Sequence, residues 1–367
     1  MRQIRFACRI VYAGILSLVL LSTFITSCNK PKSKFNVKTR ELSFRNKTKD
    51  VIHGKAILDV PGVSDIIFID SLFLFATKDP AGQLKVYSAN TCRLLGSFCM
   101  EGRAKNEFLR GRLLTKQVYH NGEGHVILPF SDAPYIVKEV DVTESLLQGH
   151  TVVLSVMDNE GYTIFLDNDI NKKFVFISNK FEYDDEKNDV PSIYALKDTL
   201  GNAKTFKIFN SMVDNISEKY FTTPYKGSIY KHPDRNLVVQ TFSYMEYLMF
   251  FDFDKDTIFA IHEKSALSFD GVYDNSVHRD KDLAFTDASA TDNYLLVLYW
   301  RGDYYLKVPN REGPNELLVF DWDGNYINGF KMDRQILRIE YDEKRHILYA
   351  IDEGETLYKY NMTSLIP

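Results

Sequence analysis

The sequence predicts an all-β fold: a six-bladed β-propeller with four-stranded antiparallel blades, whose ring is closed by an N-terminal strand. Three observations predict it. Aromatic residues, which favour pleated strands, are abundant, with 26 Phe and 22 Tyr in 367 residues. A strand–turn–strand pattern recurs six times, with further apolar strand pairs between its copies. The last copy supplies three strands before Pro367, so we expect residues 51–60 to supply its fourth.

The repeated unit is an alternating apolar strand, a polar turn and a second strand, which is the pattern of a β-hairpin. Its six copies begin at Leu84, Tyr135, Ser192, Tyr247, Leu317 and Leu357. Equivalent positions advance by about 54 residues per copy, close to the length of a four-stranded propeller blade. The alternative fold is a pair of β-sandwiches.

The strands between the hairpins complete each blade. Apolar runs such as residues 66–70 with 72–77, and 337–342 with 347–352, have the length and alternation of paired inner strands. In the last unit, residues 336–341, 346–352 and 356–360 are the three expected strands. Radial closure would leave only short, protected strand edges.

The N-terminus has the order of a secretory signal. Arg2, Arg5 and Arg9 precede an apolar run from Ile10 to about Ile25, and small residues then lead to a cysteine at position 28. The run Ile25-Thr26-Ser27-Cys28 resembles a bacterial lipobox. That resemblance implies cleavage after residue 27 and acylation of Cys28, palmitate included. A lone transmembrane anchor is the alternative, but it would need about 20 apolar residues.

Three segments follow from this assignment: a lipoprotein signal peptide at 1–27, a basic tether at 28–49 and a propeller domain at 50–367. The tether is rich in Lys and Arg and reads as a solvated spacer, with attraction to anionic lipid head groups as the alternative. The whole chain has a net charge of -4 and lacks a basic stripe. We therefore expect no nucleic-acid partner.

Two loops and two strand motifs resemble one known family. Residues 101–108 (EGRAKNEF) and 311–316 (REGPNE) are similar to a Gly-Arg-Gly-Pro-Asn-Glu pattern, although Ala104-Lys105 and Glu312 depart from it. Residues 319–325 (VFDWDGN) and 338–342 (RIEYD) extend the similarity. On these residues the chain resembles the TolB-like six-bladed propeller lipoproteins of Gram-negative bacteria. The resemblance implies a propeller and an envelope location, and no established reaction.

The two Asn-Glu loops hold the candidate site residues. Glu107 and Glu316 could form the carboxyl pair of a glycosidase, in which the carboxyl groups lie about 5 to 9.5 Å apart, if both loops open on one mouth. Alternatively, these side chains fix tight loops by accepting hydrogen bonds from nearby backbone N–H groups. The wider loop or partner site comprises Arg103, Asn106, Glu107, Asn315 and Glu316.

The sequence predicts no metal site and no cofactor. Asp252, Asp254, Asp256 and Glu263 follow EF-hand spacing, but Thr257 stands where that loop needs glycine. The eight histidines show no zinc-ligand spacing, and phosphate-binding glycine-rich loops and hydrolase motifs are missing from the sequence.

We therefore expect a membrane-anchored envelope lipoprotein, in the outer membrane and on either its periplasmic or its surface face. Its propeller would be a non-catalytic binding or scaffold module that takes a protein, peptide or glycan at one mouth. The alternative is a carbohydrate-active hydrolase or lyase that uses loop carboxylates. Buried carboxylates with shifted pKa values in the channel would favour that enzyme, whereas an aliphatic channel would exclude it.

Overall fold

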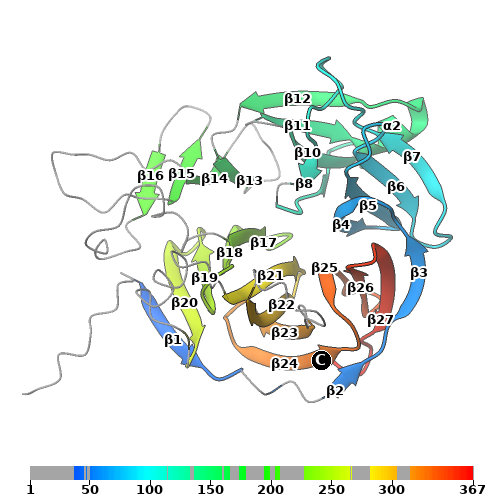
Figure 1. The fold of residues 1–367 in the computed structure, drawn as a ribbon. Coiled ribbons are helices and arrows are strands. Elements are labelled where there is room, and N and C mark those ends of the chain that lie inside the picture. The colour runs from blue at the N-terminus through cyan, green and yellow to red at the C-terminus, as the bar shows by residue number, and fades with distance from the viewer. Residues whose placement is uncertain are drawn as a thin grey trace, which may run out of the picture.

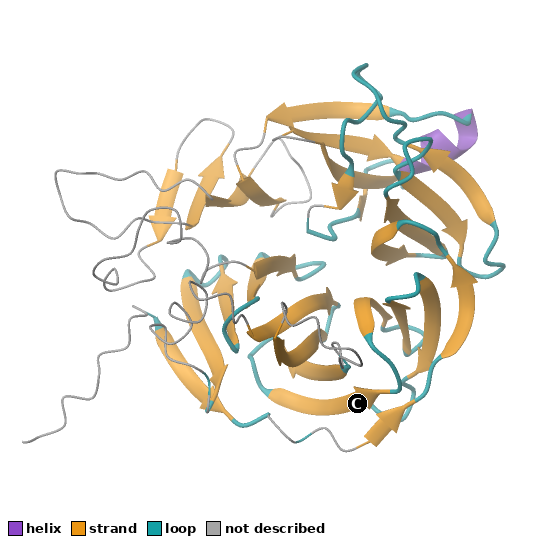
Figure 2. Cartoon of the chain, in the orientation of Figure 1, coloured by secondary structure: helices purple, strands orange, loops and turns teal. Residues whose placement is uncertain are grey.

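The computed structural model is almost entirely β, as the alternating sequence predicts (Figures 1 and 2). It describes residues 37–44, 47, 50–113, 115–132, 136–158, 161–165, 173–178, 194–198, 203–206, 227–264, 266, 282–303 and 315–366. The described strands form six sheets, each built on an antiparallel core. The chain is thus an all-β propeller with antiparallel blades.

Two sheets come from the first third of the chain. The first has the order β4-β5-β6-β7, with strands Val63–Ile69, Leu72–Thr77, Leu84–Ser88 and Leu94–Phe98. The second has the order β12-β11-β10-β8, and β9 also pairs with β10. Its strands are β8 (Arg112–Leu113), β9 (Tyr119–His120), β10 (Val126–Asp132), β11 (Ile136–Asp141) and β12 (Val153–Asp158).

A short helix interrupts the second sheet, at a place where the sequence predicted a hairpin. Helix α2 (Val142–Gln148) begins at Asp141, whose side chain accepts a hydrogen bond from the Glu144 backbone N–H, and it ends at Gly149 with φ of 73°. An N-cap acceptor and a left-handed glycine are the start and stop signals of a helix. These capping residues outweigh the alternating pattern of residues 135–149.

The third and fourth sheets come from the middle of the chain. The third has the order β13-β14-β15-β16, with strands Gly161–Phe165, Lys173–Ser178, Tyr194–Asp198 and Ala203–Phe206. The fourth has the order β1-β20-β19-β18-β17. Its strands are β17 (Gly227–Lys231), β18 (Leu237–Phe242), β19 (Tyr247–Asp252), β20 (Thr257–Glu263) and the early strand β1 (Lys38–Leu42).

The last two sheets also include early strands. The fifth has the order β2-β24-β23-β22-β21, and the sixth has the order β25-β26-β27-β3. The fifth consists of β21 (Asp282–Ala290), β22 (Tyr294–Asp303), β23 (Glu316–Asp321), β24 (Tyr326–Met332) and β2 (Asp50–Ile52). The sixth consists of β25 (Ile336–Asp342), β26 (Ile347–Asp352), β27 (Thr356–Asn361) and β3 (Lys55–Asp59).

Strands β4, β8, β17, β21 and β25 face a common centre and are the inner strands of their sheets (Figure 1). Strand β25 lies beside both β4 and β21, while β17 contacts β21 and β13, and β4 contacts β8. Four buried apolar clusters fill the spaces between neighbouring sheets; one, for example, joins Ile66 and Phe73 of the first sheet to Tyr349 of the sixth. The core is therefore divided into wedges between blades, which leaves the central channel to side chains of the inner strands.

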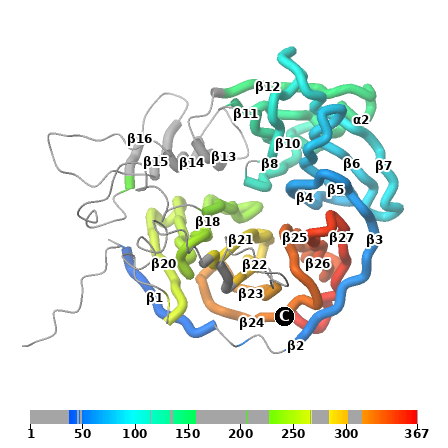
Figure 3. Tube along the Cα trace, viewed as in Figure 1, coloured from blue at the N-terminus to red at the C-terminus, as the bar shows by residue number. Residues whose placement is uncertain are grey.

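Strands β1, β2 and β3, which together with Phe44 we call the N-terminal strap, lie at the outer edges of three sheets (Figure 3). Strand β1 pairs in parallel with β20, β2 pairs in parallel with β24, and β3 pairs in antiparallel fashion with β27. Two sheets thus carry a fifth, parallel strand, which the prediction of four-stranded antiparallel blades did not include.

The strap also differs from the solvated tether expected over residues 28–49. Phe44 is 1% exposed and packs edge-on against Tyr299 and Phe320, with ring centroids 5.8 Å away in each case. Its backbone N–H donates to Glu263 Oε2 at 2.7 Å in a buried hydrogen bond. The expectation is wrong for residues 38–44, because one aromatic anchor and strand pairing outweigh the polar composition around them.

Candidate functional site

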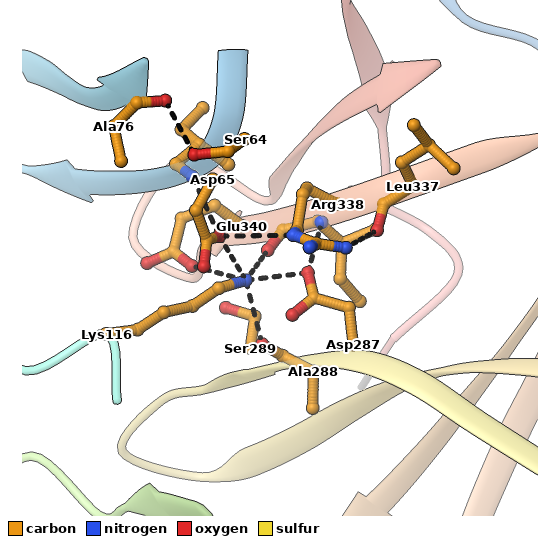
Figure 4. A network of polar contacts seen from close by, with 12 residues as sticks. Ser64, Asp65, Ala76, Lys116, Asp287, Ala288, Ser289, Leu337, Arg338 and Glu340 are labelled. Atoms are coloured by element: carbon orange, nitrogen blue, oxygen red, sulfur yellow. Dashed lines mark hydrogen bonds and ion pairs between the residues drawn. The ribbon is translucent and has the colours of Figure 1, made fainter. Parts of the chain in front are cut away.

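Five charged side chains from the inner part of the ring converge in the described channel (Figure 4). They are Asp65 of β4, Lys116 of the β8–β9 connection, Asp287 of β21, and Arg338 and Glu340 of β25. Four different sheets contribute, so the cluster exists only in the closed fold.

β-Bulges aim three of these side chains. The pairing of an inner strand with its neighbour shifts register immediately before Asp65, before Asp287 and before Arg338. A bulge inserts an extra residue and redirects the side chain beside it. Strands β4, β21 and β25 therefore each carry a charged side chain into the channel while other residues of the same strands pack in the apolar wedges.

Lys116 is at the centre of the cluster, and its side chain is 7% exposed. Its backbone φ of 54° is in the left-handed region, which costs a non-glycine residue energy. The ammonium group donates to Asp287 Oδ2 at 2.7 Å and to the backbone oxygens of Ile339 at 2.8 Å and Ala288 at 3.2 Å. Asp65 Oδ1 lies 3.6 Å from it and Glu340 Oε2 lies 4.0 Å from it.

The surrounding carboxylates keep Lys116 charged. Burial alone would lower the pKa of its ammonium group, but the charges of Asp287, Asp65 and Glu340 together raise it above the usual value. A protonated amine has no lone pair for nucleophilic attack. Lys116 therefore acts electrostatically, as an internal cation that links four sheets.

Asp287 is the main partner of Lys116 and is itself held firmly. Its Oδ2 also accepts from the Ile339 backbone N–H at 2.8 Å, and its Oδ1 accepts from the Tyr230 hydroxyl at 3.1 Å. Arg338 Nε lies 3.7 Å from Asp65 Oδ1, which gives the second carboxylate a cation of its own. Burial nevertheless raises the pKa of Asp65.

Glu340 is different because its carboxyl group lacks a strong partner. Burial raises its pKa to about 8, against the opposing charge of Lys116. Among the buried side chains that the structure describes, its Oε2 is the one oxygen or nitrogen atom without a hydrogen-bond partner. Such an atom costs about 1–3 kcal/mol of stability and calls for a functional explanation.

A pocket of about 190 Å³ lies directly above this cluster. Lys116 and Glu340 contribute to its floor, and its walls include Phe68, Thr115, Gln117 and Tyr230. Phe68 is the sixth residue of β4 and Ala290 is the last residue of β21, while His232 and Pro233 follow the end of β17. The pocket therefore belongs to the mouth at which the inner strands end.

The Asn-Glu loops predicted from the sequence lie at the opposite end of their sheets. The connection 99–111 leads into β8, and Asn315 precedes β23, two strands after the inner strand β21. Because strands alternate in direction, both positions are at the end where the inner strands begin. Arg103 and Asn106 are exposed there.

The geometry of Glu107 is that of a loop-fixing residue. Its Oε2 accepts from the Ala104 backbone N–H at 2.8 Å, and its own N–H donates to the Ala104 oxygen at 3.0 Å. A side chain on Gly102 would sit 1.9 Å from Glu107 Oε2, so this turn needs glycine there. The Glu107 carboxyl group is thus committed to the backbone of its own loop.

Glu316 begins β23, where it faces Tyr299 and Lys331 in the neighbouring strands. The Asn315 oxygen accepts from Met332 N–H at 2.6 Å. Residues 311–314 and the acylation candidate Cys28 lie outside the described residues.

The Asp-rich turns use their carboxylates within the fold. Asp252 Oδ1 accepts from the Lys255 backbone N–H at 3.0 Å, and Glu263 binds the strap at Phe44. Within the described ranges, His, Cys, Asp and Glu residues form no group suited to hold a metal ion. In the channel, three carboxyl groups surround an ammonium group instead.

Sequence reasoning missed this channel cluster. Asp65, Lys116 and Asp287 each look like an isolated charge in a short segment, whereas Arg338 and Glu340 were noted only as part of a family-like motif. The available signal was a charged residue within an otherwise apolar inner strand, as in residues 63–69 and 336–342. What that signal could not supply was the partner, which comes from a different sheet.

Comparisons with known proteins agree with this architecture. A member of the DUF4221 family from Bacteroides vulgatus ATCC 8482 matches with a TM-score of 0.53 and 11% identity, covering 86% of this chain and 98% of that one. A putative exported protein from Bacteroides fragilis NCTC 9343 matches with a TM-score of 0.50 and 10% identity, covering 88% and 98%. No curated protein matches the chain. The family described as TolB-like 6-blade propeller-like matches residues 46–344, and the chain belongs to it.

Proposed function

We propose that this chain is a lipid-anchored envelope protein whose six-bladed ring, completed by β3, binds a partner at the pocket mouth without catalysing a reaction. The observation that carries the proposal is the pocket floor. Lys116 lines the pocket, and it engages the neighbouring Asp287 directly, at 2.7 Å, with both side chains almost fully buried. Such groups shape and polarise a binding surface, but they are not available as nucleophile or base.

Two further observations support the envelope setting. The N-terminal segment has the order of a lipoprotein signal and ends at Cys28. One structural neighbour is described as an exported protein. The described part of the chain contains no helix long and apolar enough to cross a bilayer. We place the anchor in the outer membrane, with a protein, peptide or glycan as the partner.

The test compares the two mouths of the ring. Full-length protein is crosslinked in membranes, solubilised and purified as wild type, as Ala290→Trp, which fills the pocket, and as Glu107→Ala, which alters the opposite end. We expect Ala290→Trp to lose the crosslinked partner and Glu107→Ala to keep it. Loss in Glu107→Ala alone would place the binding surface on the Asn-Glu loops and contradict the proposal.

One observation favours a second candidate, a carbohydrate-active hydrolase or lyase. Glu340 lines the pocket and has a pKa raised to about 8, as a general acid requires. Its nearest carboxylates, Asp65 and Asp287, are neutralised by Arg338 and Lys116, which weakens the case for a second catalytic group. Turnover of a polysaccharide panel that Glu340→Gln abolishes would establish the enzyme.

A further inference from the structure

One of the residues that line the pocket has a buried polar atom without a hydrogen bond in the described structure. One oxygen of Glu340 accepts the backbone N–H of Phe68, whereas Oε2 is buried without a hydrogen bond. A ligand in the pocket that Glu340 lines would be near enough to supply the missing hydrogen bond after a small movement of the side chain.

The other polar groups around the pocket already have partners. The Tyr230 hydroxyl donates to Asp287 and accepts the Ala288 backbone N–H at 2.9 Å. His232 Nε2 faces the Asp292 oxygen at 2.9 Å, and its Nδ1 accepts backbone N–H groups of residues 234 and 235. Lys231 donates to two backbone oxygens, at residues 232 and 233. Glu340 is therefore the group through which a ligand would be recognised.

The charges of the floor favour an uncharged ligand. In the cluster beside the pocket, the cations Lys116 and Arg338 are matched by the carboxylates Asp65 and Asp287. Lys231, which also lines the pocket, directs its ammonium group to two backbone oxygens. Well below pH 8, Glu340 is mostly protonated and uncharged, because burial raises its pKa to about 8. A charged ligand would unbalance this buried set and lose its own hydration, which is costly.

The volume of the pocket and the residues that line it limit the class of ligand further. A volume of about 190 Å³ equals that of roughly six water molecules, at about 30 Å³ each. Phe68 and Tyr230 present aromatic surface, while Thr115 and Gln117 present a hydroxyl and an amide. Phe68 is held in place by Tyr349, with the ring centroids 5.3 Å apart. This combination fits one sugar ring, with its apolar face on an aromatic side chain and its hydroxyl groups on polar ones.

We propose, building on the binding function above, that the pocket recognises a single neutral sugar unit of a glycan and that Glu340, as a protonated carboxylic acid, donates a hydrogen bond to one of its oxygens. Lys116 and Asp287 position the site, because they hold β25 and β21 together beneath it. Lys231, His232 and Tyr230 form the facing wall.

The test uses full-length protein in detergent with glucose, galactose and N-acetylglucosamine as neutral probes and glucuronate as the charged counterpart of glucose. Binding is measured by saturation-transfer NMR and calorimetry between pH 6 and pH 9. We expect at least one neutral sugar to bind about tenfold more tightly than glucuronate, with its affinity falling as the pH rises through about 8.

Two variants separate the role of the proton from that of shape. Glu340→Gln keeps a hydrogen-bond donor and does not titrate, so its affinity should persist at pH 9. Glu340→Leu should lose affinity about tenfold at every pH, and Glu107→Gln, at the opposite mouth, should match wild type. Absence of binding for all neutral sugars, or equal binding by Glu340→Leu, would overturn the sugar proposal. If the crosslinked partner is still lost in Ala290→Trp, the binding function stands and the ligand is a polypeptide.

Discussion

One ammonium group joins four sheets in this protein. Lys116 extends from the second sheet to Asp65 of the first, Asp287 of the fifth and the β25 backbone of the sixth. A buried cation of this kind adds little compared with an apolar core, but removing it leaves carboxylates uncompensated. The role of Lys116 is to fix the positions of the inner strands relative to one another beside the pocket.

Replacing Lys116 should therefore be costly. We expect Lys116→Met to lower the free energy of unfolding by about 3–5 kcal/mol, because Asp287 would lose its buried partner. Lys255→Met is the matched control: its ion pair with Asp252 is on the surface, the lysine is 71% exposed, and the loss should be about 0–1 kcal/mol. Urea titrations of both variants measure the difference. Equal losses would mean that the channel cluster does not hold the ring together.

Glu340 should make stability depend on pH. Its folded pKa, about 8, lies above the unfolded value of 4.5, so its contribution is fully present below pH 4.5 and is lost as the pH rises toward 8. Glu340→Gln does not titrate. We expect the difference in the free energy of unfolding between the variant and wild type to shift steadily in favour of the variant across this pH window. At pH 8 to 9 the variant should be the more stable of the two in urea unfolding. Parallel curves for the two proteins would refute the shift.

At the scale of elements, the strap adds one edge strand to each of three sheets. Arg40 of β1 donates to the backbone oxygen of Asp323 at 2.9 Å and to Asn325 Oδ1 at 3.1 Å, which ties the fourth sheet to the fifth. Gly54 and Tyr360 donate to Asp333, between β24 and β25, at 3.3 and 2.8 Å. Burial alone would raise the pKa of Asp333, but the hydrogen bond from Arg334, together with those from Tyr360 and Gly54, lowers it to about 2.

Phe44 tests the strap directly. Phe44→Ala should cost about 3–5 kcal/mol, since the side chain is 1% exposed and fills a wedge between the fourth and fifth sheets. Val51→Ala, in the same strap but at a residue that is 49% exposed, should change stability by about 0.5 kcal/mol or less. Thermal unfolding and protease cleavage of the N-terminal segment report both effects. A Phe44→Ala protein as stable as Val51→Ala would restore the solvated-tether interpretation.

At the scale of the whole molecule, the strap places the anchor. If Cys28 carries the lipid, about ten residues separate it from β1, a span of at most about 35 Å. The membrane would then lie near the edge of the fourth sheet, to which β1 belongs, and the strap would connect the lipid anchor to the propeller.

Cys28→Ala should release the protein from the membrane. The substitution removes the sulfur atom that would carry the acyl chain, so we expect less protein in the membrane fraction and no incorporated radiolabelled palmitate. Cys92→Ala is the control, because Cys92 is a free thiol within the first sheet's hairpin and should leave both the label and the membrane fraction unchanged. Membrane retention of unlabelled Cys28→Ala would contradict the lipid anchor.

The family and the β-propeller class followed from the sequence, because strand alternation and hairpin spacing are local properties that each segment carries by itself. Six hairpin-like units along the chain and the apolar runs between them were enough. Helix α2 was not predicted from the sequence, because its N-cap residue Asp141 lies inside an alternating apolar and polar run. The strap was not predicted either, because the anchoring role of Phe44 depends on Tyr299 and Phe320, more than 250 residues away.

The functional site depended on the tertiary structure almost entirely. Residues 101–108 and 311–316 stood out as motifs, yet the described pocket lies at the other mouth. By itself the sequence determined the strands, the signal-like N-terminus and the family, since these rest on short-range patterns. Only the tertiary structure decided that Asp65, Lys116, Asp287, Arg338 and Glu340 meet, because burial and charge pairing among four sheets arise when the inner strands are brought together.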